Sequence, residues 1–206
     1  MLSIPNMVII GGNSRNSGKT TMACEIISKL SGIHEVIGLK VTSVRPGEDE
    51  MHGVHTDESI SEFSLFEEIN TVSAKDTSKM LRSGAIRVFY VKVSDKFIEK
   101  AVLHFMSKYI NKQVIVCESR SLRRIINPGL FLMMMRLPEE GKSKNDIETF
   151  LSLADKVFCS NTDQTEMKQF VDNLQFVNNE FHQKGDESVR NRKKQHHFAD
   201  QISNVT

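Results

Sequence analysis

A stretch rich in glycine, serine and threonine near the amino terminus has the residue types that bind phosphate. It runs G-N-S-R-N-S-G-K-T-T over residues 12–21 and follows the apolar segment 7–12. In a phosphate-binding (Walker A) loop, backbone N–H groups and the positive end of the next helix surround the phosphates. A lysine neutralises the β- and γ-phosphates, and the following hydroxyl binds Mg²⁺. The stretch therefore predicts a nucleotide-binding loop with Mg²⁺ as cofactor.

Individual roles follow from the residue types. Gly18 should let the phosphates approach, Lys19 should act as the catalytic cation, and the Thr20 hydroxyl should ligate Mg²⁺. The competing interpretation is a chance Gly-Lys-Thr in an ordinary turn between a strand and a helix. We expect the nucleotide contacts to comprise Asn13, Ser14, Arg15, Asn16, Ser17, Gly18, Lys19, Thr20 and Thr21.

One position departs from the usual phosphate-loop pattern. The common spacing leaves four residues between the first glycine and the Gly-Lys pair, whereas five separate Gly12 from Gly18. Asn13 therefore stands where the first glycine is expected. Asparagine tolerates left-handed backbone better than most residues, so we expect Asn13 to replace that glycine.

Three polar residues follow later apolar segments. Glu118 ends segment 113–118, where it could hold Mg²⁺ or orient an attacking water, or simply form a salt bridge. Asn161 and Asp163 follow segment 155–160 and could bind a purine. The Asp163 carboxylate could accept hydrogen bonds from guanine N1–H and from the exocyclic amine. The alternative interpretation is that Asp163 is the N-cap of the next helix.

The loop and these residues need a frame of strands and helices. Apolar runs of strand length alternate with amphipathic helical segments, which predicts an α/β fold. We expect the three-layer fold of P-loop NTPases, with a mostly parallel sheet between helices. Helices are expected over 19–30, over 164–181, and around Phe97, Ile98, Ala101, Val102, Phe105 and Met106. Strands are expected over 7–12, 34–41, 85–93, 113–118, 129–135 (including Met133, Met134 and Met135) and 155–160.

Length and composition set the outer limits. The 206 residues suit one domain over 1–182, followed by a polar tail over 183–206. The net charge of +1 and the absence of tryptophan argue against a nucleic-acid partner. No apolar run reaches the length of a membrane span, and Cys24, Cys117 and Cys159 lie in apolar surroundings. We therefore expect a cytoplasmic protein that binds neither nucleic acid nor membrane. Residues 45–68 carry eight acidic residues against Arg45 and are expected to form a solvated loop or short helix.

Five stretches in a fixed order suggest a family. They are S-G-K-T-T (17–21), G-L-K-V-T-S-V (38–44), A-K-D-T-S-K-M-L-R-S-G-A (74–85), V-I-V-C-E (114–118) and V-F-C-S-N-T-D (157–163). Over most of residues 6–163 this order resembles the molybdopterin-guanine dinucleotide biosynthesis adapter family, the MobB type. Beyond the phosphate loop, the matching positions are Lys40, Lys75, Asp76, Thr77, Arg82, Gly84, Ala85 and Glu118.

The resemblance implies a function. It implies a homodimer that binds GTP and hydrolyses it weakly, and that helps a partner nucleotidyltransferase attach a nucleotide to a molybdopterin-type cofactor. Lys40, Asp76 and Arg82 would then contact substrate or phosphate, with Asp76 as a helix N-cap and Arg82 as a surface residue as the plainer interpretations.

Two other functions remain open at this point. A small-molecule kinase that uses ATP would need a carboxylate near its acceptor, and Glu118 or Asp57 could supply it. A non-catalytic module would use the nucleotide to order the acidic segment 45–68, which would then dock a basic partner.

Overall fold

Alternating apolar side chains bury both faces of the central strands. In β1 (Leu2–Gly12), Val8 and Ile10 pack into one hydrophobic cluster, and Met7 and Ile9 pack into the other. The same alternation runs through β6 (Val114–Glu118) and β7 (Ile126–Met135). Side chains along a strand point to opposite faces in turn, so this pattern requires a covering layer on each side.

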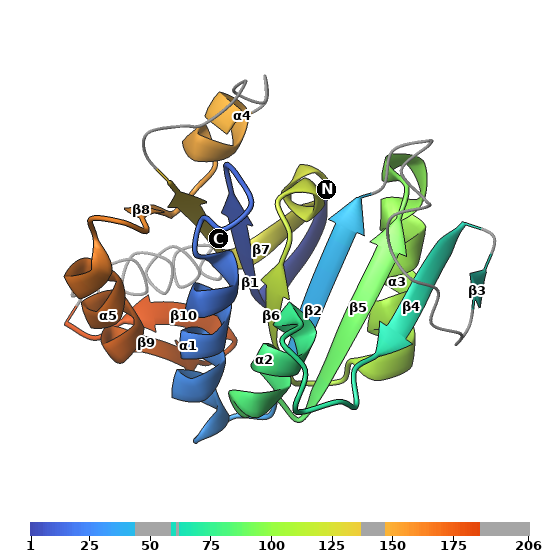
Figure 1. Cartoon of the computed structure of the whole chain (residues 1–206), viewed down its shortest axis with the longest axis horizontal. Coiled ribbons are helices and arrows are strands. Elements are labelled where there is room, and N and C mark those ends of the chain that lie inside the picture. The colour runs from blue at the N-terminus through green and yellow to red at the C-terminus, as the bar shows by residue number, and fades with distance from the viewer. Residues whose placement is uncertain (44–58, 61, 137–146, 186–206) are drawn as a thin grey trace, which may run out of the picture.

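The computed structural model describes residues 1–43, 59–60, 62–136 and 147–185 (Figure 1). Within them, one eight-stranded sheet has the order β3-β4-β5-β2-β6-β1-β7-β8. Neighbouring strands from β5 to β8 are parallel, and β3 and β4 join at one edge in antiparallel pairing. The remaining strands of this sheet are β2 (Val36–Ser43), β3 (Ser59–Ile60), β4 (Phe63–Glu67), β5 (Arg87–Val93) and β8 (Lys156–Cys159).

Helices form the two outer layers. Side chains of α1 (Lys19–Ser31), α2 (Asp76–Arg82) and α5 (Gln164–Asn173) belong to one cluster, and those of α3 (Ile98–Tyr109) and α4 (Ile147–Ser152) to the other. Short 3₁₀ turns, η2 (Asp95–Phe97) and η3 (Ser121–Arg124), complete these layers. The predicted three-layer α/β fold is therefore confirmed. No helix in the described ranges is long and apolar enough to span a membrane.

The six predicted strands and the helices predicted over 19–30 and around residues 97–106 are present, with ends shifted by a few residues. The methionine run at 133–135 lies in β7, where Met133 and Met134 are fully buried. Cys117 is buried as expected, whereas Cys24 and Cys159 are only partly buried.

The predicted helix over 164–181 is wrong in its second half. Helix α5 ends at Asn173, and β9 (Leu174–Val177) and β10 (Glu180–Gln183) form an antiparallel hairpin. Its turn residues Asn178 and Asn179 have φ angles of 53° and 64°. Two consecutive left-handed residues make the tight turn that matches the twist of a two-stranded ribbon, and asparagine accepts that conformation.

The expectation of a loop or short helix over 45–68 is wrong at its end. Residues Phe63–Glu67 form β4, and Phe63 and Leu65 are buried beside β5. Residues 44–58, with Asp57, and residue 61 lie outside the described residues. The expected tail also lies outside them from residue 186 onward, and Gln183 at its predicted start belongs to β10.

The strand register brings polar residues together at one edge of the sheet. Glu118 ends β6 and lies opposite Ile10 of β1 on one side and opposite Lys40 of β2 on the other. Alternate residues of a strand share a face of the sheet, so Glu118 shares its face with Val114 and Val116, and Lys40 shares its face with Val36. This is the face that α1 and α2 cover. The register therefore places Glu118 and Lys40 side by side beneath these helices.

The hairpin predicts an order of stability that a helix would reverse. Asn179→Gly should leave the free energy of unfolding unchanged or raise it, whereas Asn179→Ala should lower it by about 1 kcal/mol, because alanine resists the left-handed backbone. Gln169 is exposed in α5, and there the alanine variant should have a free energy of unfolding about 1 kcal/mol higher than the glycine variant. Urea unfolding of the four variants measures both orders. If the alanine variant were more stable than the glycine variant at both positions, the hairpin would be contradicted.

Candidate functional site

The loop between β1 and α1 depends on two glycines. A Cβ on Gly12 would lie 2.4 Å from Ser17 Oγ, and Gly18 has a φ of 88° with its Cβ position 3.0 Å from Ser160 Cβ. Gly18 is also the N-cap of α1 and offers the first-turn N–H groups no side-chain cap. A close turn thus leads into a helix start whose N–H groups can receive an anion.

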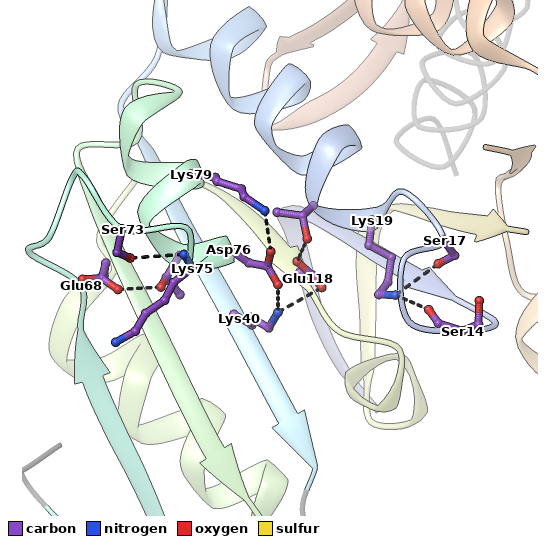
Figure 2. Close-up of polar contacts among 12 residues, drawn as sticks. Ser14, Ser17, Lys19, Lys40, Glu68, Ser73, Lys75, Asp76, Lys79 and Glu118 are labelled. Carbon is purple, nitrogen blue, oxygen red and sulfur yellow. Dashed lines mark hydrogen bonds and ion pairs between the residues drawn. The ribbon is translucent and has the colours of Figure 1, made fainter. Parts of the chain in front are cut away.

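Lys19 folds back over this loop. Its Nζ donates to the Ser14 carbonyl oxygen at 2.7 Å and to Ser17 Oγ at 3.2 Å (Figure 2). Burial lowers the pKa of Lys19, because it penalises the charged form, and the nearby Glu118 charge opposes that shift. The ammonium is therefore held at the loop by two neutral oxygen acceptors. Arg15 and Asn16 at the tip of the loop are exposed.

Asn13 occupies the expected glycine position without left-handed backbone. Among the described loop residues before Gly18, it is Asn16 that has a positive φ, of 59°. The Asn13 side chain is buried and exchanges two 3.1 Å hydrogen bonds with the backbone of Arg136, one in each direction. Its own N–H donates to the Met134 carbonyl at 3.2 Å. Asn13 therefore fastens the loop to the end of β7, which a glycine could not do.

A direct bond joins the loop to the end of β6. The Thr20 hydroxyl donates to Glu118 Oε2 at 2.8 Å, and Glu118 is only 6% exposed. The two residues predicted to hold Mg²⁺ are therefore in contact. A hydroxyl and a carboxylate side by side are the hard oxygen donors that Mg²⁺ prefers.

A lysine bridges Glu118 to a second carboxylate. Lys40 Nζ lies 2.5 Å from Asp76 Oδ2 and 3.3 Å from Glu118 Oε1 (Figure 2). Asp76 also pairs with Lys79, at 3.4 Å. Asp76 is the first residue of α2 and not its N-cap, which is Lys75. The plainer interpretation of Asp76 as an N-cap is therefore wrong.

Opposing effects act on the ionisation of this cluster. Burial alone would raise the pKa of Asp76, but hydrogen bonds and charge from Lys40 and Lys79 hold it below its usual value. Burial alone would lower the pKa of Lys40, but Glu118 and Asp76 together raise it. Both groups of the short pair therefore remain charged at neutral pH.

Arg82 does not join this cluster. Its Nη1 donates to the carbonyls of Thr71 and Ser73 at 2.6 and 2.9 Å, which fixes the segment that leads into α2. The structure thus gives Arg82 the bonds of a loop-fixing residue near the surface. It does not bring Arg82 to the β1–α1 loop.

The turn after β8 lies beside the loop, and several hydrogen bonds form within this turn. Asp163 Oδ2 accepts the Cys159 N–H at 2.6 Å, which lowers the pKa of Asp163, and its Oδ1 accepts the Thr162 hydroxyl at 2.7 Å. Asn161 Oδ1 accepts the Cys159 thiol at 3.0 Å. Asp163 occupies the N-cap position of α5, as the alternative predicted, although its side chain bonds backward to β8.

A groove of about 800 Å³ begins at the loop and runs between α1 and α5. Thr21, which is exposed, lies at its loop end, next to Gly18. Its volume is in the range of small-molecule sites. The other lining residues are Glu25, Ser28, Lys29, Ser160, Gln164, Thr165, Met167, Lys168, Val171 and Asp172.

Sequence reasoning missed three participants. Lys79 lies three residues after Asp76 on α2, and that spacing was the available signal. Ser160 and Arg136 gave no signal in the sequence. Ser160 contacts Gly18 and Arg136 contacts Asn13, and both contacts join distant parts of the chain.

Comparisons with protein-family models, with curated proteins and with solved structures each found no match to this chain. The site must therefore be interpreted from its own geometry. That geometry combines a helix start without a side-chain cap, a lysine held at the loop by neutral acceptors, and a hydroxyl joined to a buried carboxylate. These groups can together bind an anion and a hard divalent cation at one edge of the sheet.

The role of Asn13 predicts opposite results at two positions in one loop. Asn13→Gly restores the usual loop glycine yet should lower the free energy of unfolding by about 1–3 kcal/mol, because the Arg136 backbone loses both partners. Asn16→Gly, the matched control, should cost nothing, since Asn16 already has left-handed backbone. Urea unfolding measures both. Equal effects of the two substitutions would contradict the assigned role of Asn13.

Proposed function

We propose that this protein is a P-loop nucleotide-binding protein that binds GTP with Mg²⁺ and hydrolyses it slowly. The observation that carries the proposal is the bond from Thr20, on the first turn of α1, to Glu118 at the end of β6. It unites the loop hydroxyl and a strand-end carboxylate at the carboxyl edge of a parallel sheet, where ligands of open α/β folds bind.

The residues fit a magnesium ion. No three His, Cys, Asp or Glu side chains gather into a metal site in the described ranges. Mg²⁺ needs no such cage, because it is commonly held by one or two carboxylates, water and the phosphates of its nucleotide. Thr20 and Glu118 would hold it, and it would neutralise charge between the β- and γ-phosphates.

The remaining loop groups would bind the phosphates. The N–H groups from Asn13 to Thr21 and the start of α1 would face the phosphate chain. Lys19 would exchange its neutral acceptors, Ser14 and Ser17, for phosphate oxygens. Slow hydrolysis is proposed because the sequence identifies no arginine finger and no glutamine that would position the attacking water. The groove beside Gly18 and Thr21 is the space available for the nucleoside.

The biological setting is proposed from the resemblance to the MobB-type adapters. The protein would act as a cytoplasmic homodimer that assists a partner nucleotidyltransferase working on a molybdopterin-type cofactor. Lys40 and Asp76, which lie close to Glu118, would meet a substrate at the same edge. Three free cysteines accord with a reducing compartment.

Calorimetric titration with GTP and with ATP, each with Mg²⁺, tests the proposal. Lys19→Ala should weaken nucleotide binding about tenfold to a hundredfold, because it removes a charge-assisted hydrogen bond to phosphate. Lys112→Ala is the matched control, since Lys112 is exposed before the amino end of β6, far from the loop. Phosphate release measures the hydrolysis.

Each result has a defined meaning. GTP binding that requires Lys19 supports the proposal. A preference for ATP, with phosphate appearing on an acceptor, would favour a small-molecule kinase. Binding of neither nucleotide, or equal loss in both lysine variants, would contradict a phosphate site in this loop.

A further inference from the structure

Lys40 occupies the point between the two carboxylates of the candidate site. Its Nζ contacts Asp76 and Glu118 at once, and Glu118 uses its other oxygen for Thr20. The side chain of Lys40 is 23% exposed and that of Glu118 is 7% exposed. One compact cation therefore already neutralises the carboxylate through which Mg²⁺ would be held.

This placement is fixed by the fold. Lys40 and Glu118 are register partners on neighbouring parallel strands, and Asp76 begins the helix that covers them. Gly38, two residues earlier on the same face as Lys40, brings the sheet close to α2, since its Cβ position lies 3.4 Å from Met80 Cβ. Lys40 therefore reaches both carboxylates directly from its strand.

We propose that the Lys40 ammonium and the divalent cation compete for Glu118, so that cation binding displaces Lys40 from that carboxylate. The inference rests on the proposed function, because it concerns the same magnesium site. Two like charges within reach of one ammonium repel each other, and either cation relieves that repulsion. Both together would place two positive charges at one point in a partly buried site.

The competition gives Lys40 a positioning role. Once displaced from Glu118, the ammonium remains on β2 at the sheet edge, within reach of whatever lies beside the phosphates. Cation binding thus makes a positive charge available for an anionic substrate. Lys40 would be released only when the metal that the site needs is present.

Lys79 provides a matched control. It carries the same charge and also contacts Asp76, but it lies 3.4 Å away, is 46% exposed, and makes no contact with Glu118 in the described structure. If only the loss of a positive charge mattered, replacing either lysine would change the cation affinity alike. Competition for the bridging position involves Lys40 alone.

The experiment is a Mn²⁺ titration of the full-length protein without nucleotide, followed by electron paramagnetic resonance of free Mn²⁺. Lys40→Met should bind Mn²⁺ about tenfold more tightly than the unmodified protein, because the competing charge-assisted contacts are gone. Lys79→Met should change the affinity less than about twofold. Adding Glu118→Gln to Lys40→Met should abolish the gain.

Any other pattern overturns the inference. Mn²⁺ affinity that Lys40→Met leaves unchanged would show that the ammonium does not compete, and equal gains in both lysine variants would show a general charge effect. If Lys40→Met does not fold, Lys40→Gln, which retains an N–H donor for Asp76, takes its place in the same titration. Because no nucleotide is present, failure here is separate from failure of the GTP titration.

Discussion

A buried carboxylate at the end of β6 is the constraint on which the site depends. Glu118 is almost fully buried, and a buried charge is costly unless hydrogen bonds and an opposite charge compensate it. Thr20 and Lys40 provide that compensation from two different elements. The start of α1 and the register of β2 are therefore tied to one side chain. Removing either partner would leave a buried charge incompletely paired.

The loop is held at both of its ends. At its helix end, Thr20 bonds to β6, and at its strand end, Asn13 bonds to the backbone that follows β7. Between these points, Asn16 and Gly18 supply the left-handed backbone that turns the chain. The extra residue in the loop is thus accommodated by moving the strained position to Asn16 and using Asn13 as an anchor.

Much of the fold could be predicted because its signals are local. Alternating buried side chains such as Met7 to Ile10 define the strands, and the polar loop before Lys19 marks the helix start. The Asn-Asn turn at 178–179 was also a local signal, yet the preceding helical periodicity hid it. Strand β4 was hidden by the acidic residues before it, although Phe63 and Leu65 alternate as a strand requires.

The site was less predictable because its bonds join distant residues. Candidate residues could be found singly, as Glu118 was at the end of an apolar strand. Its contacts with Thr20, 98 residues away, and with Lys40, 78 residues away, follow only from the order of strands in the sheet. No local pattern in the sequence reveals that order. Arg82, a matching motif position, bonds to the carbonyls of its own neighbouring segment, which the motif did not indicate.

The two lysines of the site differ in what would release them. Lys19 donates to a backbone carbonyl and a hydroxyl, which are neutral acceptors, whereas Lys40 binds two carboxylates. Lys40 gains Coulomb attraction to two opposite charges, which the neutral acceptors of Lys19 do not provide, so an anion should draw Lys19 away more readily than Lys40. Lys40 leaves Glu118 only when another cation takes over that carboxylate. On the proposed function, phosphate would therefore recruit Lys19 and the metal would free Lys40, so that each part of a metal–nucleotide complex acts on a different lysine.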